Sequence, residues 1–362
     1  MLAGRGPGPS RPRPRLSSRQ VIETLHVGIL GGGNISETHA RAVGEIPGLR
    51  VAAIAGHNAG RAQALAARHG AVAYSETDAL LRHRPLDLVL IGSPSGLHAE
   101  QGIAAARAGL HVLTEKPIDV SLARADALIA ACDAAGVKLG LFFQDRFAPG
   151  LVRLRQAIDE GALGRLVLAS ARAKWWRPAE YYSGSRWRGT LALDGGGALI
   201  NQGIHTVDLL LWLMGDVHRV FARAANLQHR IEGEDTLVAT LEFCSGALAT
   251  LEATTAAWPG YPRQVELTGT EGTVTIQGDR VAAADLRAPR PELVGQNAST
   301  NAAAHSPTVS DVRGHRAALE DFVGAIREGR EPRCGGREGR RSLMVVDALY
   351  RSARAATPIV LE

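Results

Sequence analysis

The sequence predicts an α/β protein of two domains: a parallel sheet covered on both faces, followed by an α+β domain with an open, mostly antiparallel sheet. Three observations lead to this fold class. Short apolar strands alternate with Ala-rich helical patterns in the first half of the chain, which is typical of parallel sheets. A glycine-rich turn separates the first strand from the first helix. Beyond residue 145, alternating β segments follow one another closely, as they do in antiparallel sheets.

The order of the elements divides the 362 residues into a tail (1–22), a first domain (23–145) and a second domain (146–362). In the first domain we expect strands at 25–30, 50–55, 87–92, 110–114 and 137–143, and helices at 35–45, 59–69, 97–108 and 122–135. In the second we expect strands at 165–174, 217–226, 236–243, 247–255, 264–268, 272–277 and 359–361, helices at 150–160, 312–328 and 337–355, and a loop at 288–308. The last helix and strand are candidates for packing back on the first domain.

The basic character of the chain belongs to the tail. All five arginines of the tail precede the first acidic residue, Glu23, and without them the 41 basic residues fall to 36, which is also the number of acidic residues. The tail is rich in Pro, Gly and Ser, so we expect it to be disordered. Because the rest of the chain is balanced in charge, we expect no nucleic acid partner.

Cysteine usage and hydropathy argue against three further classes of protein: disulfide-bonded, zinc-binding and membrane-spanning proteins. Cys132, Cys244 and Cys334 lie far apart and form no CxxC pair, which indicates reduced thiols in a cytoplasmic protein. The histidines show no HExxH or Cys-paired spacing, so we expect no metal site. No apolar run reaches the roughly 18 residues that a membrane helix needs, so we expect no membrane partner.

The glycine-rich turn is a candidate phosphate-binding loop. Gly31, Gly33 and Ser36 follow the first strand and open the first helix in the pattern G-x-G-x-x-S. Gly31 would make the tight turn, and Gly33 would let the backbone approach a pyrophosphate at the helix N-terminus. Ser36 is small enough for the packing role of a third glycine. The loop, which includes Asn34 and Ile35, therefore predicts a Rossmann dinucleotide-binding domain, with an ordinary Gly-rich turn as the alternative.

The end of the second strand bears on the choice between NAD and NADP. NAD-binding proteins usually carry an acidic residue at this point, which binds the 2′-hydroxyl of the ribose. Here Gly56 is followed by His57, with Arg61 four residues further on, and no acidic residue is present. His57 and Arg61 are suited to face a 2′-phosphate, so we expect a site that tolerates NADP.

A largely apolar segment in the middle of the chain carries polar residues at helical spacing. Asn201, His205 and Asp208 fall in one column of a helix, together with Trp212. A second column must face the core and consists of Ile200, Ile204, Val207 and Leu211. The polar column therefore lies at the border of the buried face, where a cavity could open. A satisfied polar cluster is the alternative interpretation.

These motifs together resemble those of the Gfo/Idh/MocA family of oxidoreductases. The resemblance rests on the loop described above, on "SPSGLH" (93–98), on "TEKPI" (114–118) and on "GGALINQGIHTVD" (196–208). It implies a bound NAD or NADP, a homodimer or homotetramer joined through the second sheet, and a catalytic pair formed by Lys116 and His205. We expect further cofactor contacts from the residues after the strands, namely Ser93, Pro94, His98, Glu115 and Gln144.

The residue types suit the oxidation of a secondary alcohol. His205, with an ordinary pKa near 6.5, would accept the hydroxyl proton, and Lys116 would hold the oxygen and stabilise alkoxide charge. Asn201 stands where the family usually has Asp and would orient sugar hydroxyls without adding charge. Asp208 would orient His205, with a helix-surface hydrogen bond as an equal alternative.

The segment "KWWRPAEYYSGSRWRG" (174–189) is the candidate substrate loop, because aromatic faces stack on sugars and arginines grip anions. Its candidate substrate contacts, besides Lys116, Asn201 and His205, are Arg177, Tyr181, Arg186 and Trp187. An aromatic contact between subdomains is the alternative. The loop and "RIEGEDT" (230–236) are similar to the branch of the family that holds UDP-N-acetylglucosamine-uronate 3-dehydrogenases. That branch implies C3 oxidation of a nucleotide-linked uronic acid. The alternatives are an inositol or free-sugar dehydrogenase, an NAD-dependent glycosidase, and a non-catalytic cofactor-sensing regulator.

Overall fold

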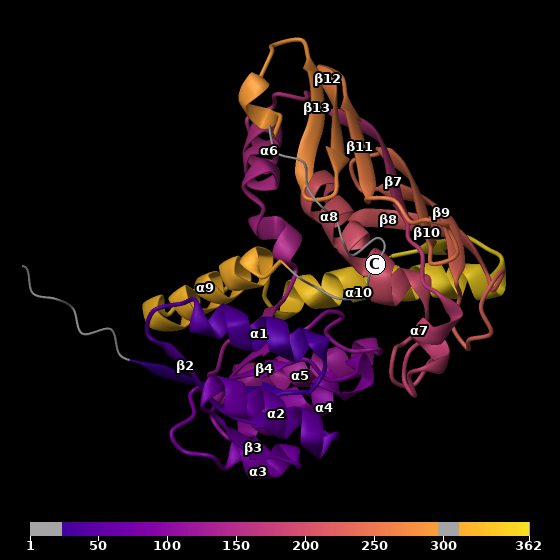
Figure 1. Cartoon of the computed structure of the whole chain (residues 1–362). Helices are drawn as coiled ribbons and strands as arrows, with labels where there is room; N and C mark the ends of the chain where they lie inside the picture. Colours follow the sequence, from indigo (N-terminus) through magenta and orange to yellow (C-terminus); the bar gives the residue numbers. More distant parts are fainter. Residues whose placement is uncertain (1–23, 296–310, 362) are drawn as a thin grey trace, which may run out of the picture.

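The structure, a computed structural model of the full chain, describes residues 24–295 and 311–361. The tail at 1–22 and residues 296–308 of the expected loop lie outside the described residues. Figure 1 shows the first domain in indigo and purple and the second domain beside it, with a large sheet coloured from magenta to orange. None of the helices in the described ranges combines the length and the apolar character that crossing a membrane requires.

A six-stranded parallel sheet forms the centre of the first domain. Its strands are β1 (Leu25–Leu30), β2 (Leu49–Ala55), β3 (Val72–Tyr74), β4 (Leu88–Ile91), β5 (His111–Thr114) and β6 (Leu139–Leu141). They lie in the order β3-β2-β1-β4-β5-β6, so the winding reverses between β1 and β4. Ligands of such sheets bind at this reversal, outside the carboxyl ends of the strands.

Helices cover both faces of the first sheet. They are α1 (Asn34–Gly44), α2 (Ala59–His69), α3 (Thr77–Leu81), α4 (His98–Arg107) and α5 (Leu122–Ala135). Helices α1 and α2 pack on one face, and α3, α4 and α5 pack on the other. The sequence pattern does not reveal β3 and α3, because β3 is only three residues long and α3 is a single turn.

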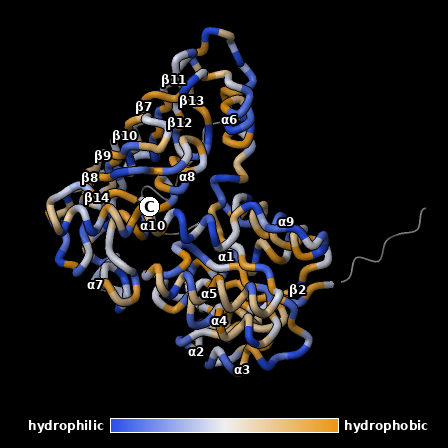
Figure 2. Tube along the Cα trace, turned by 180° about the vertical axis from the view of Figure 1, so that it is seen from behind, coloured by the Kyte–Doolittle hydropathy of each residue, from blue (hydrophilic) through white to orange (hydrophobic). Residues whose placement is uncertain are grey.

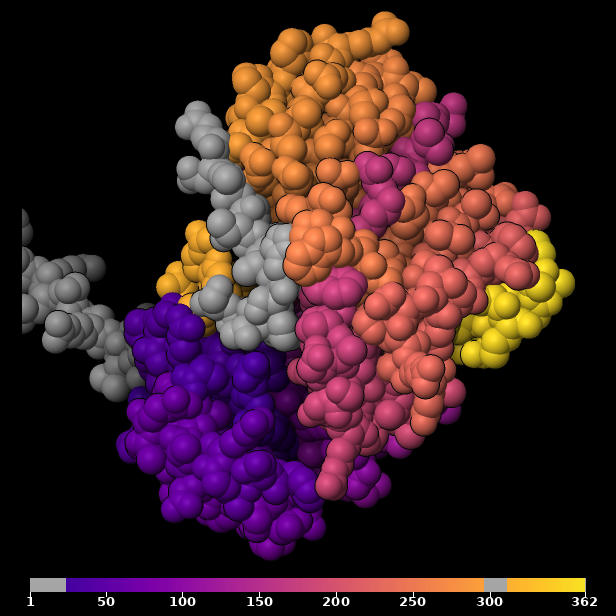
Figure 3. Space-filling model, turned by 45° about the vertical axis from the view of Figure 1, so that its right-hand side comes forward, coloured from indigo at the N-terminus to yellow at the C-terminus, as the bar shows by residue number. Residues whose placement is uncertain are grey.

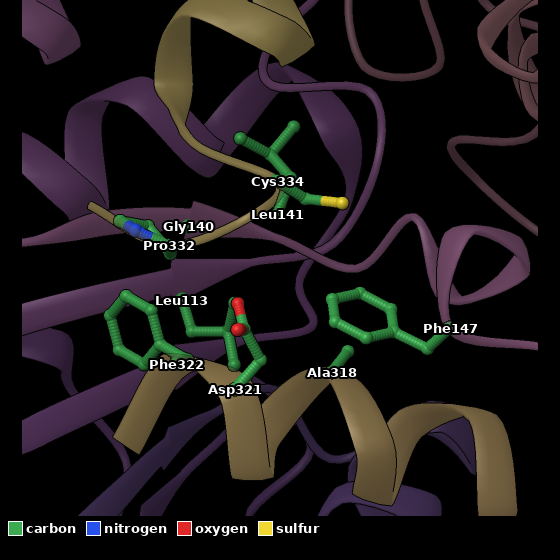
Figure 4. Close-up of a pocket in the computed structure, with 9 residues that line it drawn as sticks. All are labelled: Leu113, Gly140, Leu141, Phe147, Ala318, Asp321, Phe322, Pro332 and Cys334. Atoms are coloured by element: carbon green, nitrogen blue, oxygen red, sulfur yellow. The ribbon is translucent and has the colours of Figure 1, made fainter. Parts of the chain in front are cut away.

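A helix from the C-terminal part of the chain completes one layer of the first domain. Helix α9 (Arg313–Glu328) packs beside α1, and its Leu319 and Phe322 enter the core that α1 and α2 share. In Figure 4, Phe322 faces β5 and β6 at Leu113 and Gly140, across a gap that leaves no room for a water molecule. A Cβ at Gly140 would lie 2.7 Å from the Phe322 ring, so this close approach requires glycine.

An eight-stranded mixed sheet forms the second domain. Its order is β13-β12-β11-β7-β10-β9-β8-β14, and the described pairs are antiparallel except for β7 with β10. The strands are β7 (Leu166–Lys174), β8 (Val217–Ala225), β9 (Thr236–Phe243), β10 (Leu248–Thr254), β11 (Gln264–Gly269), β12 (Gly272–Gln277), β13 (Arg280–Leu286) and β14 (Ile359–Val360). The predicted fold class, an open and mostly antiparallel second sheet included, is confirmed.

Among the described residues, helices cover one face of the second sheet. Helices α6 (Pro149–Asp159), α8 (Ile204–Met214) and α10 (Gly336–Ala355) pack on it, and the view from behind shows α6 and α8 on the same side of the strands (Figure 2). Helix α10 also contacts α5 and β6 of the first domain. The expectation that the C-terminal strand packs on the first domain is wrong, because β14 pairs with β8 through the backbone of Ile359 and Val360.

Candidate active site

The phosphate-binding loop has the geometry that a dinucleotide requires. Gly31 adopts a φ of 128°, and a Cβ there would lie 2.7 Å from the carbonyl oxygen of Gly92. Gly33 caps α1 with extended backbone, and a Cβ there would meet open space. Asn34 is exposed and Ile35 partly exposed at the start of α1. The first backbone amides of α1 are thus open to an anion at the positive end of the helix dipole.

Ser36 takes the packing position of the third glycine. It is fully buried, its Oγ has no hydrogen-bond partner, and a Cβ on Gly31 would lie 2.8 Å from that Oγ. Such a close approach between the turn and the helix tolerates only a small side chain. The residues present therefore fit a pyrophosphate held by backbone amides.

The two residues chosen for the adenosine end lie beside this loop. His57 and Arg61 are both exposed, after β2 and in the first turn of α2. The Arg61 backbone donates a 3.0 Å hydrogen bond to the side chain of Asn58, which caps α2. A Cβ built on Gly32 would lie 3.9 Å from Cβ of Arg61, so the arginine is anchored next to the phosphate loop with its guanidinium in solvent.

Two side chains of the 93–98 segment, those of Ser93 and His98, are bound to other parts of the first domain. Ser93 and Pro94 follow β4, and Ser93 Oγ donates a 2.7 Å hydrogen bond to Gln101. His98, expected to contact the cofactor, is instead 1% exposed, with its ring nitrogens 2.8 Å from the Pro117 carbonyl oxygen and 3.0 Å from that of Ser93. The reason is that His98 ties the loop after β4 to the loop after β5.

The carboxylate of Glu115, another expected cofactor contact, has partners within the protein. Its Oε1 lies 3.1 Å from Nε2 of His39 on α1 and 3.3 Å from Nε2 of His315 on α9. Although burial acts to raise it, the pKa of Glu115 is held well below its usual value by hydrogen bonds from His315 and His39. Among the described residues this trio alone has the composition of a metal site. Both imidazoles already have the shared carboxylate oxygen within hydrogen-bond reach. His39, His315 and Glu115 therefore connect α1 and α9 to the end of β5.

The structure brings Lys116 and the polar turn before α8 together. Nζ of Lys116 donates a 2.7 Å hydrogen bond to the backbone carbonyl oxygen of Asn201. The next helical turn carries His205, whose side chain is 11% exposed. Burial and then the Lys116 ammonium lower the pKa of His205 to about 3, so the expectation of an ordinary histidine pKa is wrong. Burial also lowers the pKa of Lys116.

A carboxylate that sequence reasoning missed faces the imidazole. Oδ2 of Asp145 lies 3.7 Å from Nδ1 of His205, which is buried and has no hydrogen-bond partner. Arg263 holds Asp145 through a 2.7 Å hydrogen bond and donates another to the Gly278 carbonyl. Gln144, the preceding residue, has a buried Oε1 without a partner. Buried polar atoms without a partner are uncommon in folded proteins, so these two, on the imidazole and on the amide, mark this part of the chain as a candidate functional site.

Asp208 does not orient His205. Its carboxylate is 1% exposed and accepts hydrogen bonds of 2.8 and 2.7 Å from Arg146 and one of 2.9 Å from Ser342. Arg146 is itself buried and needs an anion, and the paired charge-assisted bonds satisfy it. The role expected for Asp208 is therefore wrong; Asp145 is the acid beside His205.

A local departure from α-helical geometry sets the position of Asn201. Residues Ala198–Gly203 form a π-helical turn before α8. A Cβ at Gly197 would lie 1.8 Å from the carbonyl oxygen of Glu234, so the strand connection at Glu234 requires glycine there. The Glu234 carboxylate accepts hydrogen bonds from the backbone amides of Leu199 and Gly197, at 2.7 and 3.2 Å. The motif "RIEGEDT" thus supports the turn, a role that the sequence did not indicate.

The candidate substrate loop reaches the same turn. Gln202 donates a 3.0 Å hydrogen bond to the Tyr181 hydroxyl and accepts one of 3.2 Å from Arg177, which is 1% exposed. Trp187 lies beside Arg188, whose guanidinium is 4.0 Å from the centre of the Tyr181 ring. Arg186 is exposed at the rim. Arg177 thus links the loop to the turn that carries Asn201.

A hollow of about 510 Å³ lies against this loop. Its walls come from α7 (Ala179–Ser183), the residues that follow it, and the connection between β8 and β9, with Tyr182, Arg188, His229, Arg230 and Glu232 among the lining residues. Glu232 accepts a 2.8 Å hydrogen bond from the Leu191 amide. Figure 3 shows the segment around α7 facing the first domain across a recess.

Comparison with known proteins agrees with this geometry. Family models match residues 25–143, as "Oxidoreductase family, NAD-binding Rossmann fold", and residues 151–275, as "GFO/IDH/MocA C-terminal domain". The fold and the site thus define an NAD-binding oxidoreductase that acts on CH–OH groups. The chain belongs to the Gfo/Idh/MocA family, and the expected family and cofactor are confirmed.

Relatives of known structure and curated relatives cover nearly the whole chain. The WlbA dehydrogenase from Bordetella pertussis, in complex with NADH and UDP-GlcNAcA, is 34% identical with a TM-score of 0.86, over 94% of this chain and 98% of that one. D-xylose 1-dehydrogenase (NADP(+)) 2 of Haloferax volcanii is 30% identical over 92% of this chain and 99% of its own. Inositol 2-dehydrogenase of Rhizobium meliloti is 28% identical over 91% and 97%.

Proposed function

We propose that this protein oxidises the C3 hydroxyl of a UDP-linked N-acetylated hexuronic acid, with NAD or NADP as the hydride acceptor. The observation that carries the proposal is the meeting of Lys116 and the turn at Asn201 and His205, beside a loop that fits a dinucleotide. The 34% identity to a dehydrogenase whose structure contains UDP-GlcNAcA supports this substrate class.

In the proposed reaction, Lys116, His205 and Asp145 have different roles. A nicotinamide held beside the phosphate loop would supply the acceptor for the hydride of the alcohol carbon. Lys116 keeps one N–H on the Asn201 carbonyl and has two more for the alcohol oxygen, where its charge stabilises the developing alkoxide. Because its pKa is lowered to about 3, His205 is neutral at working pH but a weak base, so it accepts the hydroxyl proton only if the imidazolium is stabilised. The Asp145 carboxylate, 3.7 Å from Nδ1, stabilises the imidazolium that forms.

The substrate loop suits a sugar that carries negative charge. Arg177 and Arg188 lie near the Tyr181 ring, and the adjoining hollow of about 510 Å³ is lined by Arg188 and Arg230. Guanidinium groups match the geometry of carboxylates and phosphates, and a neutral cyclitol needs neither arginine. This arrangement favours the nucleotide-linked uronic acid over inositols and free aldoses.

The open face of the second sheet supports a homodimer or homotetramer. Leu168, Phe221, Val238 and Leu248 point away from the helices and are between 37% and 55% exposed. Leu168 and Leu248 are neighbours in register on β7 and β10. Exposed apolar side chains gathered on one face indicate a protein interface. The three unpaired cysteines fit a cytoplasmic location.

A substrate panel tests the proposal. Protein stripped of bound nucleotide would receive NAD or NADP, and reduced-cofactor absorbance would be followed with UDP-GlcNAcA, other UDP-sugars, free aldoses and inositols. We expect the highest kcat/KM with a UDP-uronate. Turnover of aldoses or inositols without response to any UDP-uronate would contradict the proposed substrate. Release of sugar from a chromogenic glycoside would indicate a glycosidase instead.

A further inference from the structure

One buried carboxylate near the turn that carries Asn201 has no role in the proposed mechanism. Asp194 is 1% exposed and directly precedes the three glycines that lead into the π-helical turn. Its Oδ2 accepts a 2.8 Å hydrogen bond from the Gly189 amide, and its Oδ1 accepts one from the Asn201 side-chain amide. We propose that Asp194 is a positioning residue of the active site: its ionised carboxylate fixes Asn201, which holds Lys116, and its presence requires an amide at position 201. The proposal rests on the oxidation proposed above.

Asn201 links the carboxylate to the catalytic lysine. Its side-chain Nδ2 donates to Asp194, its Oδ1 accepts a 2.8 Å hydrogen bond from Gln202, and its backbone oxygen accepts the 2.7 Å bond from Lys116. The amide is therefore held on both sides. This geometry gives Asn201 a different role from the orientation of sugar hydroxyls, because its side chain is occupied by neighbours within the protein.

The charges explain why position 201 carries an amide. An acid at position 201 would place two carboxylates in direct contact, and one of them would have to bind a proton. With asparagine, the donor faces the single carboxylate and the site keeps one negative charge against the Lys116 ammonium, which acts to lower the pKa of Asp194. The pair should therefore tolerate an exchange of acid and amide better than either single change.

The surroundings of Asp194 also set a titration that can be measured. The titratable groups that interact with it are Lys116 after β5, Arg188 in the substrate loop, and Tyr181 and Tyr182 on α7. Burial raises the pKa of Asp194 to about 6, against the opposing hydrogen bonds from Gly189 and Asn201. An ionised Asp194 predicts that activity falls as pH drops below about 6. His205, whose pKa is about 3, does not titrate in that range.

The decisive experiment compares Asp194→Asn, Asn201→Asp and the exchange variant that carries both. We would measure kcat/KM with UDP-GlcNAcA, or with whichever member of the panel is oxidised, from pH 5 to 9, together with the Kd for NADH. We expect Asp194→Asn to lose at least tenfold and to lack the acid limb near pH 6, and Asn201→Asp to lose activity with the limb moved to higher pH. The exchange variant should recover at least tenfold over Asn201→Asp, with the NADH Kd unchanged throughout.

Controls separate this proposal from the proposed function. Asp216→Asn, at an exposed residue after α8 that pairs with Arg341, should leave the pH profile unchanged. A second control needs no substrate and measures the Tm of the NADH-bound proteins. Wild type should lose stability relative to Asp194→Asn from pH 4 to 6, because it must ionise a buried carboxyl whose pKa is raised on folding. The Tm of Asp194→Asn minus that of wild type should therefore rise over this range and then stay constant. An acid limb that persists in Asp194→Asn, an exchange variant no better than Asn201→Asp, or a constant difference in Tm would overturn the proposal.

Discussion

Nζ of Lys116 and the backbone oxygen of Asn201 are joined by a hydrogen bond of 2.7 Å, although 85 positions separate the two residues along the chain. The bond connects the loop after β5 of the first domain to the π-helical turn before α8 of the second. It therefore fixes the ammonium at the boundary of the two domains, on the side where the phosphate loop opens. The same ammonium acts on the pKa of His205, so the two groups that we propose as catalytic are electrostatically coupled.

Removal of either catalytic group should stop the chemistry and leave cofactor binding intact. We expect Lys116→Ala and His205→Ala each to lower kcat by about 10²- to 10³-fold, because each removes a group that acts on the alcohol in the transition state. The NADH Kd, measured by fluorescence, should change little. Lys138→Ala, at a lysine that pairs with Glu331 away from the site, is the matched control. A fully active His205→Ala would refute the assignment.

Asp208 should matter for stability rather than for the pH profile of catalysis. Asp208→Asn leaves Arg146 buried beside a neutral group, and breaking such a pair costs about 3–5 kcal/mol of the free energy of unfolding. Denaturant unfolding measures this loss, with Glu338→Gln as a milder control, because Glu338 contacts the same arginine at 2.6 Å but is 35% exposed. If the free energy of unfolding were unchanged and the pH profile of kcat/KM were altered, Asp208 would have a role in catalysis after all.

The cofactor site should accept NADP. Arg61 and His57 are exposed beside the phosphate loop, where a 2′-phosphate would lie. A hydrogen bond to a charged group contributes about 1.5 kcal/mol to binding, or roughly tenfold in Kd. We therefore expect Arg61→Ala to weaken NADP binding about tenfold with little effect on NAD, whereas Arg68→Ala, at the far end of α2, should affect neither. A strong preference of the wild-type protein for NAD would sink this prediction.

Acid should destabilise the fold partly through His205. Burial and Lys116 lower the pKa of His205 from 6.5 to about 3, so between these values the unfolded state binds the proton more strongly than the folded state. Stability is then lost as the pH falls below about 6.5, and this one residue accounts for about 2 kcal/mol at pH 5. Urea unfolding at pH 7.5 and 5 should show a smaller loss in His205→Gln than in wild type. Equal losses would mean that the imidazole is not held neutral.

The open face of the second sheet should hold the subunits together. Leu248→Arg places a charge beside Leu168 on the face that we assign to the interface, and an unpaired charge in an apolar contact is strongly unfavourable. Light scattering coupled to size exclusion should show a smaller assembly. Leu227→Arg, at a residue that is 73% exposed in the connection after β8, should leave the assembly unchanged. A monomeric wild type would contradict the interface.

Much of the fold follows from local sequence. Strand β1 and helix α2 have the bounds that the pattern predicts, 25–30 and 59–69, because continuous apolar runs and Ala-rich helical periods are local signals. The candidate phosphate loop and Lys116 can be proposed from the sequence for the same reason, because each stands in a short motif. Helix α9 was predicted as a helix, but its place against α1 depends on contacts between residues far apart in the chain.

The acids of the active site could not be assigned from local spacing. Asp208 has the correct helical spacing to His205, yet Arg146, which lies 62 positions away, takes its carboxylate. Asp145 lies in a short 3-10 helix (Gln144–Phe147) and Asp194 lies in a turn, so neither residue belongs to a periodic pattern, and only the fold brings them to His205 and Asn201. The position of Asp145 directly after Gln144, where the first domain passes into the second, was the one signal available.

A double-mutant cycle tests most directly whether Lys116 and His205 act on the same alcohol. It compares kcat/KM for wild type, Lys116→Ala, His205→Ala and the variant with both changes, all with the preferred substrate. Groups that act together give losses that do not multiply, so we predict that the double variant is at most about tenfold worse than the weaker single variant. Losses that multiply in full would show that the two groups act independently, and would contradict a shared catalytic site.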